Sequence, residues 1–239
     1  MRDDSLIIDV GMHVGQDSAF YLAQGFRVVA IEANPALARE AEARFRSEIA
    51  AGRLTVLNTG VGDSEGVLPF YVNAQHSEWS SFDQQIGSRG GCREVIDVPM
   101  LPFERVLERY GVPHYLKIDI EGHDFIVLQR LLLVADRPLY ISVENGWPPM
   151  LDCLTRLGYT AFKFVNQAEV PKREYTLRGR EGAELTWTFP FGASGPFGED
   201  APGAWKNAES ILGDIQSYWN NPNFDPNVYG WYDLHAKLA

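Results

Sequence analysis

The sequence has few cysteines, an excess of acidic over basic residues, and no long apolar run. Cys92 and Cys153 are its only cysteines, which are too few for a disulfide framework. The 21 Lys and Arg residues are outnumbered by 32 Asp and Glu residues, giving a formal net charge of -11. Phosphate backbones are bound by basic surfaces, so we expect no nucleic-acid partner. With no bilayer-length apolar stretch and no signal-like start, we expect a cytoplasmic protein without a membrane partner.

What is present is enough apolar material for one α/β domain. Hydrophobic residues make up 45% of the 239 residues, and apolar runs alternate with helical patterns. We predict a core domain over residues 1–190. Strands are predicted at residues 6–8, 27–31, 54–57, 67–72, 115–120 and 140–145, and helices at residues 17–24, 35–51 and 102–110.

A glycine loop follows the first predicted strand. Gly11 and Gly15 would let the backbone approach a ligand at the N-terminus of the next helix. The second strand delivers Glu32 to the carboxyl edge of the sheet, where it can bind a ribose diol. A dinucleotide loop would have glycine at positions 13 and 16, but His13 and Gln16 stand there. The pattern therefore favours S-adenosylmethionine (SAM) over NAD.

Other residues near this edge fit the same cofactor. The Asp9 carboxylate suits the amino or sulfonium end of SAM and would organise the loop. Residues 58–63, including Val61, should form a loop that contacts the adenine ring. The alternative is that the glycines only make a turn between a strand and a helix. Glu32, in register with the loop, favours the cofactor site.

A second motif combines charge with a buried strand. Lys117, Asp119 and Glu121 would project to one side, where a parallel sheet opens to its ligand. Charged residues in such a strand are unfavourable unless they are paired. The structural alternative is a Lys117–Asp119 pair followed by a helix cap at Asp124.

Together with Glu32-Ala33-Asn34-Pro35 and Ser80-Ser81-Phe82, these motifs resemble the FkbM-type methyltransferases over residues 5–145. The resemblance implies a class I SAM-dependent methyltransferase fold, which is a Rossmann-like seven-stranded sheet, mostly parallel with an antiparallel last strand. It also implies methylation of hydroxyl groups of sugars or other small molecules. We expect the cofactor to be bound by Asp9, Gly11, His13, Gly15, Glu32, Asn34, Val61, Ser81 and Asp119.

The sequence departs from the family pattern at two places. His13 replaces an asparagine that is common in the glycine loop. We expect this replacement to change the hydrogen bonds within the loop and not the identity of the cofactor. His123 and Asp124 replace a small residue and a glutamate, which raises the prospect of an imidazole near the acceptor.

Transfer of a methyl group to a hydroxyl calls for a base, because an alkyl hydroxyl is a poor nucleophile at neutral pH. The candidates are His123, Glu121 and Asp119, with Lys117 pairing Asp119 or stabilising charge on the acceptor. His123 titrates nearest neutrality, but a solvent-facing histidine in the following helix is an equal alternative.

A divalent metal is a further option at the end of the next strand. Oxygen ligands from Asp119, Glu144 and Asn145 would suit Mg²⁺. The family resemblance does not require a metal. The alternative is that Glu144 binds the acceptor directly or anchors a loop.

The last part of the chain differs in composition. Residues 191–239 are rich in aromatics and proline, and we expect an extension that packs on the core. The alternative is that this extension forms a lid over the acceptor site. Residues 185–189 are predicted to be the last, antiparallel strand, and residues 208–219 a short helix. We expect a monomer or homodimer acting on a small-molecule or saccharide acceptor. The other candidates are an inactive SAM-binding module and an NAD or nucleotide-sugar oxidoreductase, which the missing Gly-x-Gly disfavours.

Overall fold

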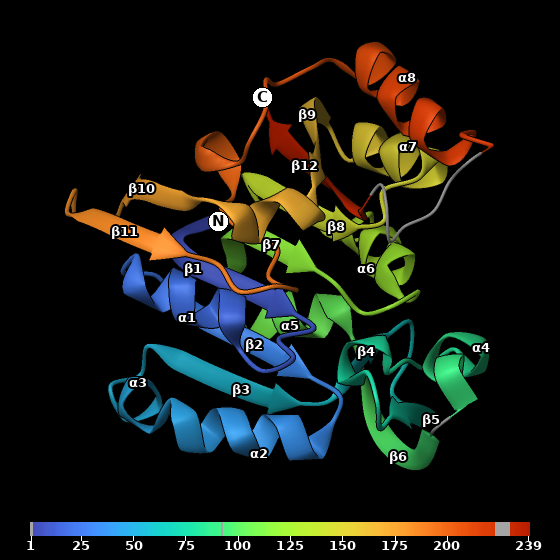
Figure 1. Cartoon of the computed structure of the whole chain (residues 1–239). Helices are drawn as coiled ribbons and strands as arrows, with labels where there is room; N and C mark the ends of the chain where they lie inside the picture. The colour runs from blue at the N-terminus through green and yellow to red at the C-terminus, as the bar shows by residue number, and fades with distance from the viewer. Residues whose placement is uncertain (1, 92, 223–229) are drawn as a thin grey trace.

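The computed structural model describes residues 2–91, 93–222 and 230–239 (Figure 1). Its strands are β1 (Arg2–Val10), β2 (Arg27–Glu32), β3 (Leu54–Asn58), β4 (Gly60–Gly62), β5 (Gly66–Asn73), β6 (Arg93–Pro102), β7 (Val112–Ile118), β8 (Tyr140–Glu144), β9 (Tyr159–Asn166), β10 (Glu174–Arg178), β11 (Glu184–Thr188) and β12 (Tyr232–Leu238). Its α-helices are α1 (Gln16–Ala23), α2 (Pro35–Arg44), α3 (Arg46–Ala50), α4 (Gln84–Gly87), α5 (Phe103–Tyr110), α6 (Asp124–Leu131), α7 (Pro148–Arg156) and α8 (Ala208–Trp219). The 3-10 helices are η1 (Ser77–Trp79), η2 (Arg89–Gly91), η3 (Gln167–Lys172) and η4 (Gly198–Asp200).

Seven strands form the central sheet, in the order β3-β2-β1-β7-β8-β12-β9. The five neighbouring strands β3, β2, β1, β7 and β8 run parallel to one another, and β12 runs antiparallel to its neighbours β8 and β9. This confirms the expected Rossmann-like, mostly parallel sheet. Leu6, Ile7 and Ile8 of β1 are fully buried, because a parallel sheet is covered on both faces.

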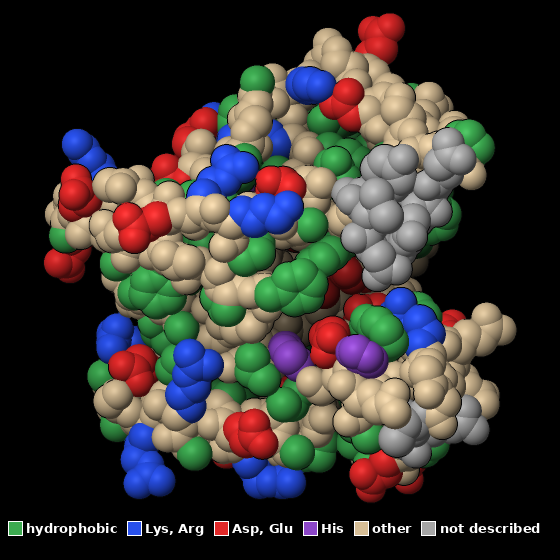
Figure 2. Space-filling view, viewed as in Figure 1, with side chains coloured by type: hydrophobic (Ala, Val, Ile, Leu, Met, Phe, Trp, Pro, Cys, Tyr) green, Lys and Arg blue, Asp and Glu red, His purple; other side chains and the backbone are tan. Residues whose placement is uncertain are grey.

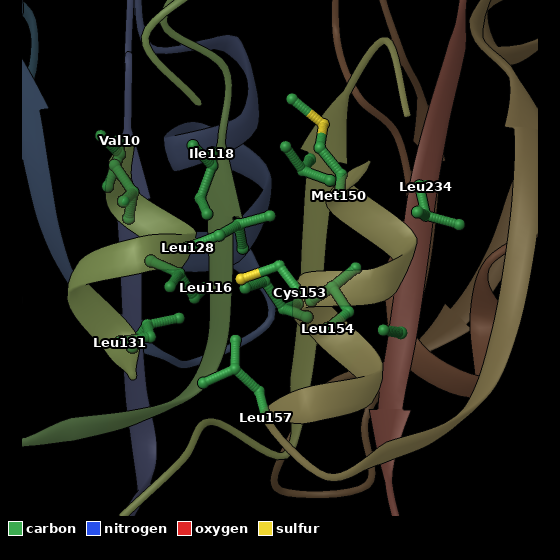
Figure 3. Close-up of a cluster of buried hydrophobic side chains, with 14 of the residues drawn as sticks. Val10, Leu116, Ile118, Leu128, Leu131, Met150, Cys153, Leu154, Leu157 and Leu234 are labelled. Carbon is green, nitrogen blue, oxygen red and sulfur yellow. The ribbon is translucent and has the colours of Figure 1, made fainter. Parts of the chain in front are cut away.

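The two faces of the sheet are covered differently. Helices α5, α6, α7 and α8 cover one face and share a core cluster with the strands. Figure 3 shows side chains of α6 and α7 packed near Leu116 of β7 and Leu234 of β12. The opposite face packs against α1, α2 and side chains between Val170 and Phe197. η3, β10 and the chain that follows β11 therefore cover part of this face.

A smaller sheet stands at the carboxyl edge. β4, β6 and β5 form three strands in that order, with β5 and β6 antiparallel, so the predicted strand at residues 67–72 is confirmed. Residues 58–63, predicted to be a loop, include β4, which pairs in parallel with β6. Residues 74–91 connect β5 to β6 and contain η1, α4 and η2.

The prediction that residues 185–189 form the last strand of the main sheet was wrong. β11 pairs with β10 in a separate two-stranded sheet, and β12 is the antiparallel strand. An alternating pattern fits any half-buried strand and does not identify its partner. In β12, Leu234 and Ala236 point to one face and Asp233 and His235 to the other. All four are buried, so both faces of this strand are covered.

The helices predicted from the sequence are present, whereas no range was predicted for α4, α6 and α7. α8 matches the short helix predicted at residues 208–219. The helix predicted after Pro35 is interrupted at Phe45, whose backbone leaves helical geometry with φ -102° and ψ 27°. Phe45 is buried and its ring lies against Gly15. The helix is therefore interrupted at the residue whose side chain packs against the glycine loop. Among the described residues, no helix is long and apolar enough to cross a membrane.

Candidate active site

A pocket opens at the carboxyl edge of the sheet. It is lined by the glycine loop, Glu32, residues 59–61, parts of residues 70–82, and residues 119–121. The space between these residues is about 690 Å³, a volume that includes the opening to solvent. Figure 2 shows a hollow in the middle of this face, with acidic and histidine side chains gathered around it.

The glycine loop closes tightly on both neighbouring strands. The amides of Gly11 and Met12 donate to the Ile31 carbonyl, each at 3.0 Å. Gly11 has a φ of +87°, and a Cβ there would lie 1.8 Å from the carbonyl oxygen of Asp119. A side chain at position 11 would therefore separate the loop from the segment after β7. This close approach is the physical reason for glycine in the motif.

Glu32 is fixed by the main chain on both of its oxygens. Oε2 accepts the His13 amide at 2.9 Å and Oε1 accepts the Asn34 amide at 2.7 Å. Burial raises the pKa of Glu32 to about 7, against the lowering effect of these amides. Each carboxylate oxygen keeps a further lone pair. Glu32 therefore fits a ribose diol, which offers two hydroxyl donors.

The predicted cofactor residues divide into two groups. Those that line the pocket are Gly11, His13, Glu32, Val61 and Asp119. The other four, Asp9, Gly15, Asn34 and Ser81, are not among the lining residues. Asp9, Asn34 and Ser81 instead form hydrogen bonds that support the residues of the pocket wall.

Asn34 accepts the Ala36 amide at 2.9 Å and caps α2, and Ser81 Oγ donates to the Glu121 carbonyl at 2.7 Å. Asp9 accepts a hydrogen bond from Ser18 Oγ at 2.6 Å. The pocket wall also offers apolar side chains that suit an adenine ring, among them Leu37 and Phe82.

Lys117 is a buried cation behind the pocket, with 2% of its surface exposed. Its Nζ donates to the Gly11 carbonyl at 3.1 Å and lies 3.3 Å from carboxylate oxygens of both Asp9 and Asp119. Burial lowers the pKa of Lys117, but the nearby carboxylates outweigh burial and raise it well above its usual value. The Lys117–Asp119 ion pair, which was the structural alternative for this motif, is thus observed. Lys117 also connects this motif to the glycine loop through its hydrogen bond to Gly11.

The segment after β7 presents Glu121 to the pocket in a constrained backbone conformation. Glu121 has a φ of +45°, which is uncommon for a residue with a side chain. The Asp124 carboxylate stabilises this turn by accepting the amides of Ile120 at 3.0 Å and Gly122 at 3.1 Å. Burial, and then repulsion by Asp119, raises the pKa of Glu121 to about 7.

His123 packs against a residue of the pocket wall but does not line the pocket itself. It is absent from the pocket lining, and its ring lies 5.2 Å from that of Phe82. Burial lowers the pKa of His123, so the imidazole is neutral at pH 7. Its role as base stays a prediction.

The structure gives no support to the predicted Mg²⁺ site. Burial, and then repulsion by Asp119 and Glu121, raises the pKa of Glu144 well above its usual value. Asn145 has a φ of +51° in the turn that follows β8. Over residues 2–91, 93–222 and 230–239, no group of three or more His, Cys, Asp or Glu side chains could hold a metal ion.

The C-terminal part of the chain reaches the pocket through a segment that we call the strap, residues 189–198. Asp17 accepts the amide of Ser194 at 3.1 Å and that of Gly195 at 3.3 Å. Gln16 donates to the Phe191 carbonyl at 3.2 Å, and Gly192 lines the pocket. The motifs did not identify Asp17, since its partners lie 177 and 178 residues away.

Arg89 was not among the predicted site residues, and its Nη2 donates to Oε2 of Glu121 at 2.6 Å. The available signal was a basic residue in the segment that also carries Ser80 and Ser81. That signal is weak, because an arginine in an exposed loop is usually solvated.

Solved structures with similar folds include several methyltransferases. A methyltransferase FkbM from Methylobacillus flagellatus KT has 17% identity and a TM-score of 0.40, over 61% of this chain and 34% of that chain. A precorrin-6y C5,15-methyltransferase from Geobacter metallireducens GS-15 has 12% identity and a TM-score of 0.42, over 100% and 82%. A SAM-dependent O-methyltransferase from Thermotoga maritima has 10% identity and a TM-score of 0.37, over 100% and 60%. These TM-scores are low, so the likenesses carry no conclusion about activity.

The family comparison is more informative. No curated protein matches the chain significantly. A sequence model of the methyltransferase FkbM domain matches residues 9–167, which include both motifs and every residue that the pocket takes from β1, β2 and the segment after β7. Because the match covers more than half of the chain, the protein belongs to the FkbM methyltransferase family and is a SAM-dependent methyltransferase.

Proposed function

We propose that the protein transfers a methyl group from SAM to a hydroxyl group of a small molecule or saccharide. The observation that carries this proposal is the joint presence of Glu32 and Glu121 in one pocket. Glu32 suits a ribose diol. Glu121 lies beside Asp119 and has a pKa of about 7, which suits a base that works near neutral pH.

The glycine loop and β2 would hold the cofactor. Glu32 would accept the ribose hydroxyls, the apolar wall with Val61 would contact the adenine ring, and Gly11 would leave room for the methionine part. When bound, SAM supplies an electrophilic methyl group on a sulfonium, whose S–C bond breaks as the O–C bond forms and whose sulfur keeps the electron pair. Asp119 would favour the positive charge on the sulfonium.

Glu121 would act as the general base. An acceptor hydroxyl within hydrogen-bond reach of its carboxylate would lose its proton to Glu121 while its oxygen attacks the methyl carbon. The fixed turn between Ile120 and Asp124 would hold the carboxylate in place, and positioning of this kind supplies a large part of the rate. Lys117 would position the Asp119 carboxylate through their ion pair.

The described parts of residues 191–239 would form an extension that borders the acceptor site. Phe191 supports this role because it is 69% exposed beside the pocket-lining Gly192. Its ring lies 5.2 Å from that of Trp231, and aromatic rings suit the faces of sugars and other flat acceptors. Part of the extension also contributes β12 to the sheet.

The test is methyl transfer from SAM carrying a ¹³C-labelled methyl group to a panel of sugars, alcohols and matched amines. We expect NMR to find the label as an O-methyl group, and only when the acceptor has a free hydroxyl. Label on nitrogen would contradict the proposed acceptor atom. Tight cofactor binding without transfer to any acceptor would favour an inactive SAM-binding module.

A further inference from the structure

One side chain outside both motifs contacts the proposed base directly. Arg89 of η2 donates from Nη2 to Oε2 of Glu121 at 2.6 Å, a short charge-assisted contact. We propose that Arg89 is a positioning residue that keeps the Glu121 carboxylate ionised and oriented toward the acceptor hydroxyl. This inference rests on the proposed role of Glu121 as base.

Residues 74–91 hold Arg89 firmly before it reaches Glu121. The Arg89 guanidinium lies over the Trp79 ring, 5.0 Å from its centroid, and His76 stacks on Trp79 at 4.1 Å. Arg89 Nε also donates to the Ile86 carbonyl at 3.2 Å. Asn73 fixes the backbone by donating to the Arg89 carbonyl at 2.6 Å. These contacts therefore set the direction of the guanidinium, although the side chain stays partly exposed.

The same segment fixes the backbone beneath Glu121. Ser81 Oγ donates to the Glu121 carbonyl at 2.7 Å, and Asp124 binds the amides on either side of this residue. With the backbone held, the remaining freedom of Glu121 lies in its side chain. The contact with Arg89 restricts that freedom.

The surroundings of Glu121 explain why a cation is needed there. The charged groups that face it are Asp119 and Asp124 of its own segment, Glu144 of β8, and Arg89. The three carboxylates and burial favour the protonated form, and Arg89 opposes them. A protonated carboxyl group is unable to accept a proton from the acceptor, so removal of Arg89 would disable the base near neutral pH.

The exposure of Arg89 separates this role from a purely structural one. Its side chain is 45% exposed, and ion pairs with an exposed partner contribute little to stability. Replacing Arg89 should therefore change the titration of Glu121 more clearly than it changes the folding of the chain.

The experiment follows the carboxyl carbon of Glu121 by NMR in the full chain labelled with ¹³C at glutamate side-chain carboxyls. The signal is assigned by its loss in Glu121→Gln. We expect Arg89→Gln to raise the pKa of Glu121 by about 1 or more, and Arg89→Lys to leave it close to that of the unchanged protein. The matched control is Arg105→Gln, since Arg105 is 57% exposed and pairs with Glu108.

Two further measurements keep the outcomes distinct. Trp79→Leu keeps the guanidinium but removes its support, so we expect a smaller rise in the pKa of Glu121. Binding of S-adenosylhomocysteine should be unchanged in all these variants. An unaltered pKa of Glu121 in both Arg89→Gln and Trp79→Leu would overturn the inference. Full methyl transfer by Glu121→Gln would instead overturn the proposed base and leave the titration result standing.

Discussion

Glu32 and Glu121 are carboxylates at the same edge of the sheet, one buried and one partly exposed, and they are held in different ways. Backbone amides of His13 and Asn34 bind both oxygens of Glu32. Glu121 is bound by the guanidinium of Arg89. Burial raises the pKa of each to about 7. Two glutamates whose pKa is raised to the same value thus differ in what restrains them.

The difference suits different tasks. Main-chain amides move only if the glycine loop moves, so they hold Glu32 as a fixed acceptor for a cofactor. A side-chain cation stabilises the charge of Glu121 and leaves it able to exchange a proton with an acceptor. We therefore treat the wall around Glu32 as the cofactor wall and the segment from Asp119 to Asp124 as the acceptor wall.

Gly11→Ala should have the largest effect, because it forces the two walls apart. The added Cβ would meet the Asp119 carbonyl at 1.8 Å, at a φ of +87°. We expect affinity for S-adenosylhomocysteine to fall by about 10²-fold, with turnover falling as well. Calorimetry and a transfer assay measure the two effects. Gly52→Ala is the matched control, since its φ is +69° with no atom within 4 Å; equal behaviour of the two variants would contradict the close approach.

Glu121→Gln should affect the acceptor wall alone. Glutamine keeps the size of the side chain but is unable to take the hydroxyl proton. We expect turnover to fall by roughly 10²–10⁴, with the affinity for S-adenosylhomocysteine kept. Steady-state kinetics with the best acceptor measure the first quantity. Normal turnover would move the role of base to Asp119 or His123.

Asp17→Asn should loosen the strap with little effect on either wall. The Asp17 carboxylate accepts the amides of Ser194 and Gly195, and asparagine offers a single acceptor oxygen in its place. We expect the free energy of unfolding to fall by about 1–3 kcal/mol, as measured by urea unfolding. The control is Asp4→Asn at an exposed ion pair, 67% exposed, which should change stability little. A larger loss from the control would contradict the anchoring role of Asp17.

The smallest effect is the pH dependence of the acceptor wall. Only ionised Glu121 accepts a proton, and its pKa is raised to about 7 by burial. The rate of methyl transfer should therefore increase with pH, about tenfold per pH unit well below 7, and level off above it. A rate that is constant between pH 5.5 and pH 8 would show that a different group accepts the proton.

The cofactor wall was the more predictable region. Its features lie in one continuous unit of strand, glycine loop, helix and strand that ends at Glu32, and the spacing within that unit determines where the loop and the end of the second strand must lie. Gly11, His13 and Glu32 line the pocket, in agreement with that spacing. The elements from β1 to β3 followed from the same alternation of strands and helices.

The acceptor wall and the strap were less predictable, because their contacts join distant parts of the chain. Arg89 and Glu121 are 32 residues apart, and Asp17 and Ser194 are 177 apart. No local pattern encodes such pairs. β12 was missed for a related reason, since its alternating polar residues, such as Asp233, are buried by parts of the chain that sequence patterns do not position.

The division between the two walls is tested most directly by titrating S-adenosylhomocysteine into Glu32→Ala and Glu121→Gln. Loss of the Glu32 carboxylate removes the ribose acceptor and frees two backbone amides, so we expect affinity to fall by about 10- to 10²-fold. Glu121→Gln should bind as tightly as the unchanged protein. Unchanged binding in a folded Glu32→Ala, together with lost binding in Glu121→Gln, would contradict the assignment of the two walls.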